Sequence, residues 1–278
     1  YKHVFEKYFS LNNIYGDTIR ESTINQYSTL FHFSLEIKEL KFQKYRRMDI
    51  ETSITNYFNV SRYRINEFNI KRKIKRISIF PISKSPIRSM SPDVLNSILK
   101  NFVNEYNIEI AFDSSSLISN YIESKLVYKN IKKIHSSNLM DLTTYIEDIE
   151  FGIFIDSGPL HLAKVLNKKG VLIVTSVDSA NLLNQFHTIA VINNCYKTKY
   201  CEAPCGLTNL INYNKQIGCY DSLKINFEDI YQFNNSNSLQ RGNLKDNYLS
   251  FMINPVGCVK KIDIKVLTKT LMKELQSI

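Results

Sequence analysis

The chain has 278 residues, 44% of them hydrophobic, which is enough for one large domain or for a small domain beside a fuller one. It contains no run of 18 or more apolar residues and no charged N-terminal region followed by an apolar core, so we expect neither a membrane span nor a signal peptide. Its 36 Lys and Arg against 26 Asp and Glu give a net charge of +10, which favours acidic partners. Because Lys, Ile and Asn are all abundant, nucleotide bias in the genome explains that charge equally well.

The first part of the chain, residues 1–73, is predicted to be a short, mainly helical N-terminal portion. Its apolar residues follow mixed helical spacing, as in TINQYSTLFHFSLEIKEL. A basic run, KRKIKR at 71–76, reads as a solvated linker, and we place a domain boundary there. Since the sequence starts at Tyr1 without a methionine, we expect it to be a processed or trimmed piece of a longer polypeptide.

Residues 74–278 are predicted to form a second, α/β domain, because short apolar strands alternate with helices along them. Ser91 followed by Pro92 is a typical start for the first of these helices. Such alternation predicts a parallel sheet that is covered on both faces. The predicted strands are 77–82, 108–112, 151–156, 170–175 and 188–193, and the predicted helices are 91–106, 116–125, 139–149, 159–168 and 263–277.

The stretch FIDSGPLHLAK, residues 154–164, is the first candidate site for an anion. Asp156 ends a strand, Ser157 supplies a hydroxyl group, Gly158 lets a ligand approach the backbone, and Pro159 starts a helix whose free N–H groups point at the same spot. The alternative is that Asp156 or Ser157 simply caps the helix. His161, three residues into that helix, is either a ligand contact or a hydrogen-bonded interior histidine.

The loop FPISKSPIRSMSP, residues 80–92, is the second candidate. It follows the predicted strand 77–82 and carries Ser83, Lys84, Ser85 and Arg88 ahead of a capped helix. Two cations and two hydroxyl groups at the carboxyl end of a strand are suited to hold phosphate oxygens, and the absence of glycine excludes a P-loop and a dinucleotide fingerprint.

A cysteine-rich segment occupies residues 195–258. Cys201, Cys205, Cys219 and Cys258 are spaced C-x3-C-x13-C-x38-C, with Cys195 just upstream. Four thiolates could hold a structural zinc or iron ion, with no open position for a substrate. Reduced buried thiols and disulfides are the alternatives.

Two stretches together resemble glycosyltransferase family 9, the bacterial heptosyltransferase-like enzymes. IDSGPLHLAKVLNKKGVLIVT is similar to the D-(S/T)-G-x-x-H-L-A motif of that family and the strand after it, and ISIFPISKSPIRSMSPDVLNSIL is similar to the first nucleotide-side strand, loop and helix. The resemblance covers 74–278, the donor-binding half of a GT-B fold with a Rossmann-like sheet. The cysteine pattern also resembles that of protein-heptosylating members. The chain departs from the family in lacking the Trp that precedes the loop Pro, and in having about 70 preceding residues, too few for a complete acceptor domain.

The resemblance implies a function and assigns roles to residues. It implies inverting, metal-independent transfer of a sugar, heptose in many members, from a nucleoside-diphosphate sugar to a lipopolysaccharide or other cell-envelope glycan, a lipid-linked acceptor or a protein. The diphosphate and sugar would contact Asp156, Ser157, Gly158, Pro159, His161, Ser83, Lys84 and Arg88. Leu139 and Met140 would lie on the nucleobase side. The resemblance supplies no catalytic base among these residues, and the expected location is the cytoplasm, with the basic surface at the inner face of the membrane.

Two other functions fit the same residues. A nucleotide-sugar-binding module that has lost catalysis would keep both anion loops. A basic nucleic-acid-binding protein would account for the charge and for KRKIKR, and it predicts a salt-dependent affinity for DNA or RNA.

Overall fold

The computed structural model describes residues 73–129, 131–136, 138–183, 188–197, 203–206 and 251–276. Nearly all of them belong to one compact unit, Phe68–Ser179 with Phe186–Ile278. The predicted helical N-terminal portion lies outside the described residues, apart from residue 73, so the domain boundary stays a prediction.

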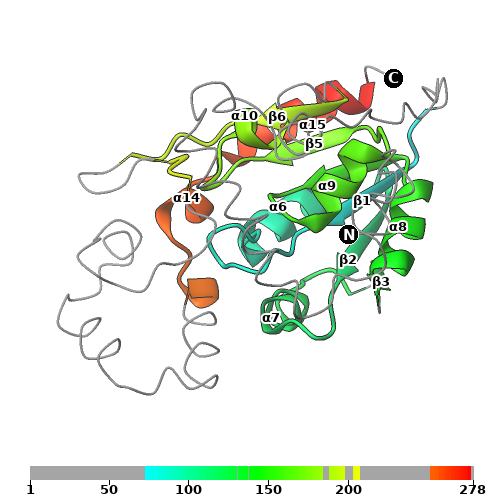
Figure 1. The fold of residues 1–278 in the computed structure, drawn as a ribbon, viewed down its shortest axis with the longest axis horizontal. Coiled ribbons are helices and arrows are strands. Elements are labelled where there is room, and N and C mark those ends of the chain that lie inside the picture. Colours follow the sequence, from blue (N-terminus) through cyan, green and yellow to red (C-terminus); the bar gives the residue numbers. More distant parts are fainter. Residues whose placement is uncertain are drawn as a thin grey trace, which may run out of the picture. The chain divides into compact units, whose positions relative to one another are not determined.

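The core of the described unit is a six-stranded, wholly parallel sheet in the order β3-β2-β1-β4-β5-β6 (Figure 1). This is the strand order of a Rossmann sheet, in which the chain winds outward from the centre in both directions. The α/β fold class and the Rossmann-like sheet are therefore confirmed. The strands are β1 (Arg76–Phe80), β2 (Asn107–Phe112), β3 (Lys132–His135), β4 (Phe151–Phe154), β5 (Gly170–Ile173) and β6 (Ile189–Ile192).

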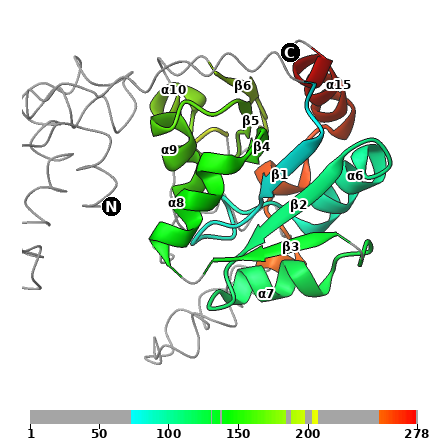
Figure 2. The same cartoon turned by 90° about the vertical axis from the view of Figure 1, so that its right-hand side faces the viewer.

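Helices cover both faces of the sheet, as Figure 2 shows. On one face lie α8 (Leu139–Asp148) and α9 (Gly158–Val165), and on the other lie α6 (Pro92–Phe102), α7 (Leu117–Ser124) and α15 (Ile264–Gln276). Two short helices, α10 (Ser179–Leu182) and α14 (Gly257–Lys260), complete the described elements. None of the helices in these residues has the length and apolar character needed to cross a bilayer.

Every strand and helix predicted between residues 77 and 277 is present, with ends that differ by a few residues. The sequence interpretation missed β3, α10 and α14. Strand β3 is the sheet edge, and its residues KKIH are exposed except for the half-buried Ile134. An edge strand with two lysines gives no apolar run, which explains why the pattern of buried strands did not reveal it.

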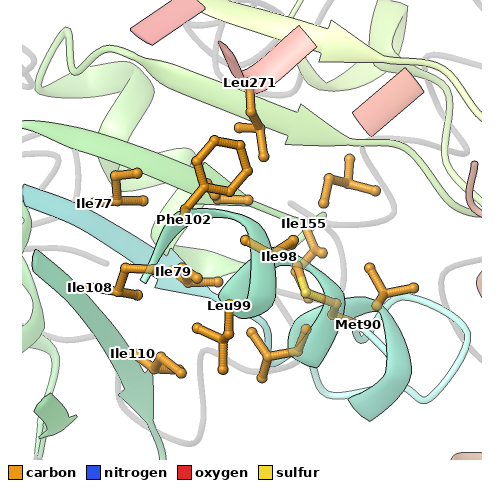
Figure 3. Close-up of a cluster of buried hydrophobic side chains, with 14 of the residues drawn as sticks. Ile77, Ile79, Met90, Ile98, Leu99, Phe102, Ile108, Ile110, Ile155 and Leu271 are labelled. Carbon is orange, nitrogen blue, oxygen red and sulfur yellow. The ribbon is translucent and has the colours of Figure 1, made fainter. Parts of the chain in front are cut away.

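The main hydrophobic core lies between the sheet and the layer of α6 and α15 (Figure 3). Alternate residues of a strand point to the same face, so Ile77 and Ile79 of β1 lie beside Ile108 and Ile110 of β2. Helix α6 covers them with Ile98, Leu99 and Phe102, and α15 contributes Leu267, Leu271 and Leu275, which are 0 to 7% exposed. These leucines form the buried face of the last helix.

On the opposite face of the sheet, a cluster of hydrogen-bonded polar side chains connects β1, β2 and β3 to α8. Glu109 of β2 is 4% exposed and lies 2.7 Å from Lys132 Nζ of β3. Tyr145 of α8 donates to Glu109 Oε2 over 2.8 Å, and its Oη is 3.0 Å from Ser78 Oγ of β1. Burial raises the pKa of Tyr145, with the Glu109 carboxylate adding to the rise, so the hydroxyl keeps its proton and remains a donor.

Helix α6 provides a modest test of the local assignments. Ser91 is the N-cap, and its Oγ accepts from Val94 N over 3.4 Å, as the Ser91-Pro92 pair predicted. We expect Ser91→Ala to lower the free energy of unfolding by about 1 kcal/mol, because one helix N–H then loses its partner. Denaturant unfolding measures this. Lys100→Ala at an exposed position of α6 is the control, and an equal loss in both variants would refute the capping role.

Candidate functional site

The candidate site lies at the carboxyl edge of the sheet, where β1 and β4 are neighbours. From β1 the chain passes through α6 to β2 on one side, and from β4 it passes through α9 to β5 on the other. The loops that leave these two strands therefore diverge. Open α/β sheets bind ligands at this point, because the diverging loops leave room outside the strands.

An ion pair connects the two loops that the sequence singled out separately. Arg88 follows β1 and Asp156 follows β4, and Arg88 Nη1 lies 3.0 Å from Asp156 Oδ2 and 3.4 Å from the main-chain oxygen of Asp156. The side chains are 18% and 7% exposed, so most of the pair is shielded from water. Arg88 Nε is buried and makes no hydrogen bond among the described residues. A buried donor without a partner is unusual in a folded protein, so this N–H calls for a partner beyond the described residues.

His161 extends this group from the first turns of α9. Its Nε2 lies 4.0 Å from Asp156 Oδ1, and its side chain is 21% exposed. Asp156 therefore has Arg88 at one carboxylate oxygen and His161 near the other. The structure brings together Arg88, Asp156 and His161, which the two sequence motifs predicted separately.

The N-terminus of α9 is not closed by a side chain. Ser157 occupies the N-cap position in extended backbone, but its side chain makes no capping hydrogen bond, and its Oγ donates to Ile155 O over 3.3 Å. Pro159 in the first turn has no N–H. In α6, α7 and α8 the N-cap side chains of Ser91, Ser116 and Asn138 each accept a backbone N–H. The interpretation of Asp156-Ser157 as a simple helix cap does not fit these contacts.

The loop after β1 is held in shape by its own serines. Ser89 Oγ accepts from Ser83 N over 3.1 Å and donates to Ser85 O over 2.9 Å, and Arg88 N bonds to Ser85 O over 3.1 Å. Ser83, Ser85 and Ser89 are buried, whereas Lys84 is exposed. The loop thereby fixes the backbone from which Arg88 reaches Asp156. Sequence reasoning missed Ser89, whose only signal was its place in a run of closely spaced serines.

Three hydroxyl groups without partners in the described part of the chain follow strands β1 and β5 beyond the carboxyl edge of the sheet. Ser85 Oγ after β1 and Thr175 Oγ1 and Ser176 Oγ after β5 are buried and have no hydrogen-bond partner among the described residues. Leaving a buried hydroxyl unpaired is unfavourable, so such groups call for a ligand or water. Sequence reasoning also missed Thr175 and Ser176, although two hydroxyl residues directly after an apolar strand were a readable signal.

Leu139 and Met140, the residues predicted to lie on the nucleobase side, are the first two residues of α8, which follows the edge strand β3. Leu139 is half-buried and Met140 is 52% exposed. At the ends of the two neighbouring strands, the rings of Phe112 and His135 stack with centroids 5.9 Å apart. Exposed apolar surface is thus present at this place, but the nucleobase contact stays a prediction.

The predicted metal site is only half within the described residues. Cys201 and Cys219 lie outside them, Cys205 is exposed, and Cys258 is buried on α14; Cys205 and Cys258 are both thiols. Within the described ranges no group of three or more His, Cys, Asp or Glu side chains could hold a metal ion. The structural zinc or iron therefore stays a prediction.

Comparison with protein families and with curated proteins gives no match. Comparison with solved structures does give matches. E. coli ADP-heptose lipopolysaccharide heptosyltransferase II is 18% identical with a TM-score of 0.37, and the match covers 46% of this chain and 40% of the other. A family 9 glycosyltransferase from Veillonella parvula is 12% identical with a TM-score of 0.45, covering 75% and 48%.

A third match is TibC, an iron-containing dodecameric glycosyltransferase of enterotoxigenic E. coli. It is 14% identical with a TM-score of 0.41, and the match covers 84% of this chain and 54% of TibC. The chain thus spans about half the length of these solved structures, or less. At these identities and TM-scores, the similarity carries no conclusion about activity, donor or acceptor.

Proposed function

We propose that this chain is the donor-binding part of a glycosyltransferase that takes a sugar from a nucleoside-diphosphate sugar. The observation that carries the proposal is the Arg88–Asp156–His161 group at the β1/β4 edge, beside a helix N-terminus that no side chain caps. The resemblance of the DSGPLHLA stretch to the family motif supports it. The acceptor, whether a lipopolysaccharide or other envelope glycan, a lipid-linked acceptor or a protein, belongs to the same proposal.

The chemical task is to stabilise a leaving nucleoside diphosphate. Negative charge builds up on the diphosphate as the bond to the anomeric carbon breaks, and fixed donors aimed at that charge lower the barrier. The backbone N–H groups at the start of α9 and the guanidinium of Arg88 are such donors. Lys84, exposed in the same loop, adds a second positive charge. These groups would serve in place of a divalent metal ion.

Asp156 has a positioning role in this proposal. A guanidinium has five N–H donors, and Asp156 Oδ2 engages Nη1 alone by the contacts above. Arg88 can therefore remain paired with Asp156 while its other donors bind a phosphate oxygen. The carboxylate fixes the direction of the arginine before the ligand arrives, which reduces the entropy lost on binding.

The remaining part of the reaction belongs to residues outside the described ones. Inversion in one displacement requires a base that removes the proton from the acceptor hydroxyl. By the resemblance, a carboxylate from the preceding part of the protein would supply it across the cleft. A catalytically reduced module differs from the enzyme at this point alone: it would bind the nucleotide sugar without releasing the nucleoside diphosphate.

Calorimetric titration with ADP, UDP and GDP and with the matching monophosphates tests the proposal. We expect one of the diphosphates to bind about 10- to 100-fold more tightly than its monophosphate, because the second phosphate adds a charge-assisted contact. Lys84→Ala should weaken diphosphate binding about 5-fold, as expected for an exposed charge. Lys100→Ala, which removes an exposed lysine of α6, is the control and should change nothing.

Three results would speak against the proposal. The first is that no nucleoside diphosphate binds, and the second is that diphosphates and monophosphates bind equally. The third is that affinity for DNA or RNA exceeds that for every nucleotide and falls steeply with salt, which would favour the nucleic-acid-binding alternative.

A further inference from the structure

A second, smaller hydrophobic core includes a residue of the loop after β1 and is separate from the main core. Its described side chains are 1 to 6% exposed, and Tyr196 packs against them. We call it the second core, and its members are Ile87, Ala203, Phe251, Val256, Cys258 and Val259. All of these except Ile87 come from the chain beyond β6. The second core therefore joins that part of the chain to the loop after β1.

Two residues that flank Arg88 attach this loop to different cores. Ile87 is 1% exposed in the second core, and Met90 is 0% exposed in the main core. The serine hydrogen bonds described above give the loop its shape, but they join residues of the loop only to each other. The packing of Ile87 and Met90 attaches the loop to the rest of the protein, and Arg88 extends to Asp156 from the backbone between them.

The chain beyond β6 is itself fixed where it forms the second core. Asn194 is 7% exposed, and its side-chain nitrogen donates to Cys258 O. Ala203 N donates to Tyr196 O over 2.7 Å. Gly257 at the start of α14 lies so close to the ring of Tyr196 that a Cβ at this position would clash with it. The loop after β1 therefore packs against a surface that hydrogen bonds and close packing hold in place.

The direction of Arg88 determines how well the proposed diphosphate site is prepared for a ligand. A guanidinium already aimed at the phosphates loses less entropy on binding than one that must first be ordered. A side chain keeps such a direction only when the residues around it are packed in place. We propose that the second core orients Arg88 for the diphosphate of the donor and that Ile87 is the positioning residue through which it acts; this inference rests on the proposed function.

Ile87→Ala tests this inference by calorimetric titration of the full chain with the nucleoside diphosphate that the wild type binds best. We expect about 5- to 10-fold weaker binding, because the ligand then has to order Arg88 itself. Leu271→Ala is the matched control, since it truncates an equally buried side chain in the main core on α15. Both variants should lower the melting temperature, because each leaves a cavity. The control should leave the affinity unchanged.

A second background separates positioning of Arg88 from a general loss of structure. In a protein that carries Arg88→Met with Asp156→Asn, the added change Ile87→Ala should weaken binding no further, because the residue through which Ile87 acts is absent. If Ile87→Ala does not fold, Val259→Ala in the same core takes its place under the same criteria.

Three results would overturn the inference while the proposed function stands. The first is an unchanged diphosphate affinity in Ile87→Ala, and the second is an equal further loss with and without Arg88. The third is a loss in Leu271→Ala as large as that in Ile87→Ala. If the wild type binds no nucleoside diphosphate, the proposed function and this inference both fail.

Discussion

Arg88→Met is expected to lower the free energy of unfolding by about 3 kcal/mol, because it leaves the Asp156 carboxylate buried without its partner. Asp156 is 7% exposed in the ion pair, so water replaces the lost guanidinium poorly. The same variant should lower the affinity for a nucleoside diphosphate about 10- to 100-fold, since a charged donor to the phosphates is lost. Denaturant unfolding and calorimetric titration measure the two effects.

A second variant separates stability from binding. Arg88→Met combined with Asp156→Asn removes the uncompensated charge, so most of the lost stability should return while diphosphate affinity stays low. Arg76→Met is the control, because Arg76 pairs with Asp148 at 2.8 Å near the amino end of β1, where Asp148 is 75% exposed. That pair should contribute at most about 1 kcal/mol and nothing to binding. A double variant that binds diphosphate as well as the wild type would contradict the role of Arg88 in binding.

Phe102→Ala should have the largest effect on the fold, about 3 to 5 kcal/mol. Phe102 is 1% exposed on α6, and Figure 3 shows it among Ile77 of β1 and Leu271 of α15. Removing the ring leaves a cavity between the sheet and two helices. Denaturant unfolding measures the loss, and Val266→Ala on the exposed side of α15 is the control, with an expected change of at most about 0.5 kcal/mol. A loss below about 1 kcal/mol for Phe102→Ala would contradict the packing of α6 and α15 over this core.

Local signals made most of the fold predictable from the sequence. Ser91 and Pro92 marked the start of α6, because a helix start depends on neighbours within a few residues. Strand β3 was not predicted, because it is held by backbone pairing with β2 and its exposed lysines give no apolar alternation. No local pattern marks Glu109 as buried, because its partners Tyr145 and Lys132 come from other elements of the fold.

The candidate site was predictable in parts, but its connections were not. The residues Asp156, His161 and Arg88 were identified from two separate motifs. Their contact depends on β1 lying next to β4, although 68 positions separate Arg88 from Asp156. Thr175 and Ser176 were also not predicted as site residues. What singles them out is that their buried hydroxyl groups have no hydrogen-bond partner among the described residues, and this is known only from the structure. Strand order and burial are properties of the whole sheet, and local patterns do not contain them.

The basic character of the chain offers a competing location for an anion. Lys265, Lys269 and Lys273 recur every fourth residue on α15 and line a groove against Asn101 of α6. This groove lies on the helix layer and not at the carboxyl edge of the sheet. Net charge alone would favour a nucleotide in the groove, whereas the Arg88–Asp156 pair and the uncapped start of α9 favour the β1/β4 edge.

A crystal structure of the full chain with a bound nucleoside diphosphate decides between the two locations. We expect the phosphates to lie within hydrogen-bonding distance of the backbone N–H groups at the start of α9 and of the Arg88 guanidinium, with Asp156 still holding the arginine. A diphosphate ordered in the α15 groove, or at the β1/β4 edge without contact to Arg88 and α9, would contradict the proposed donor site.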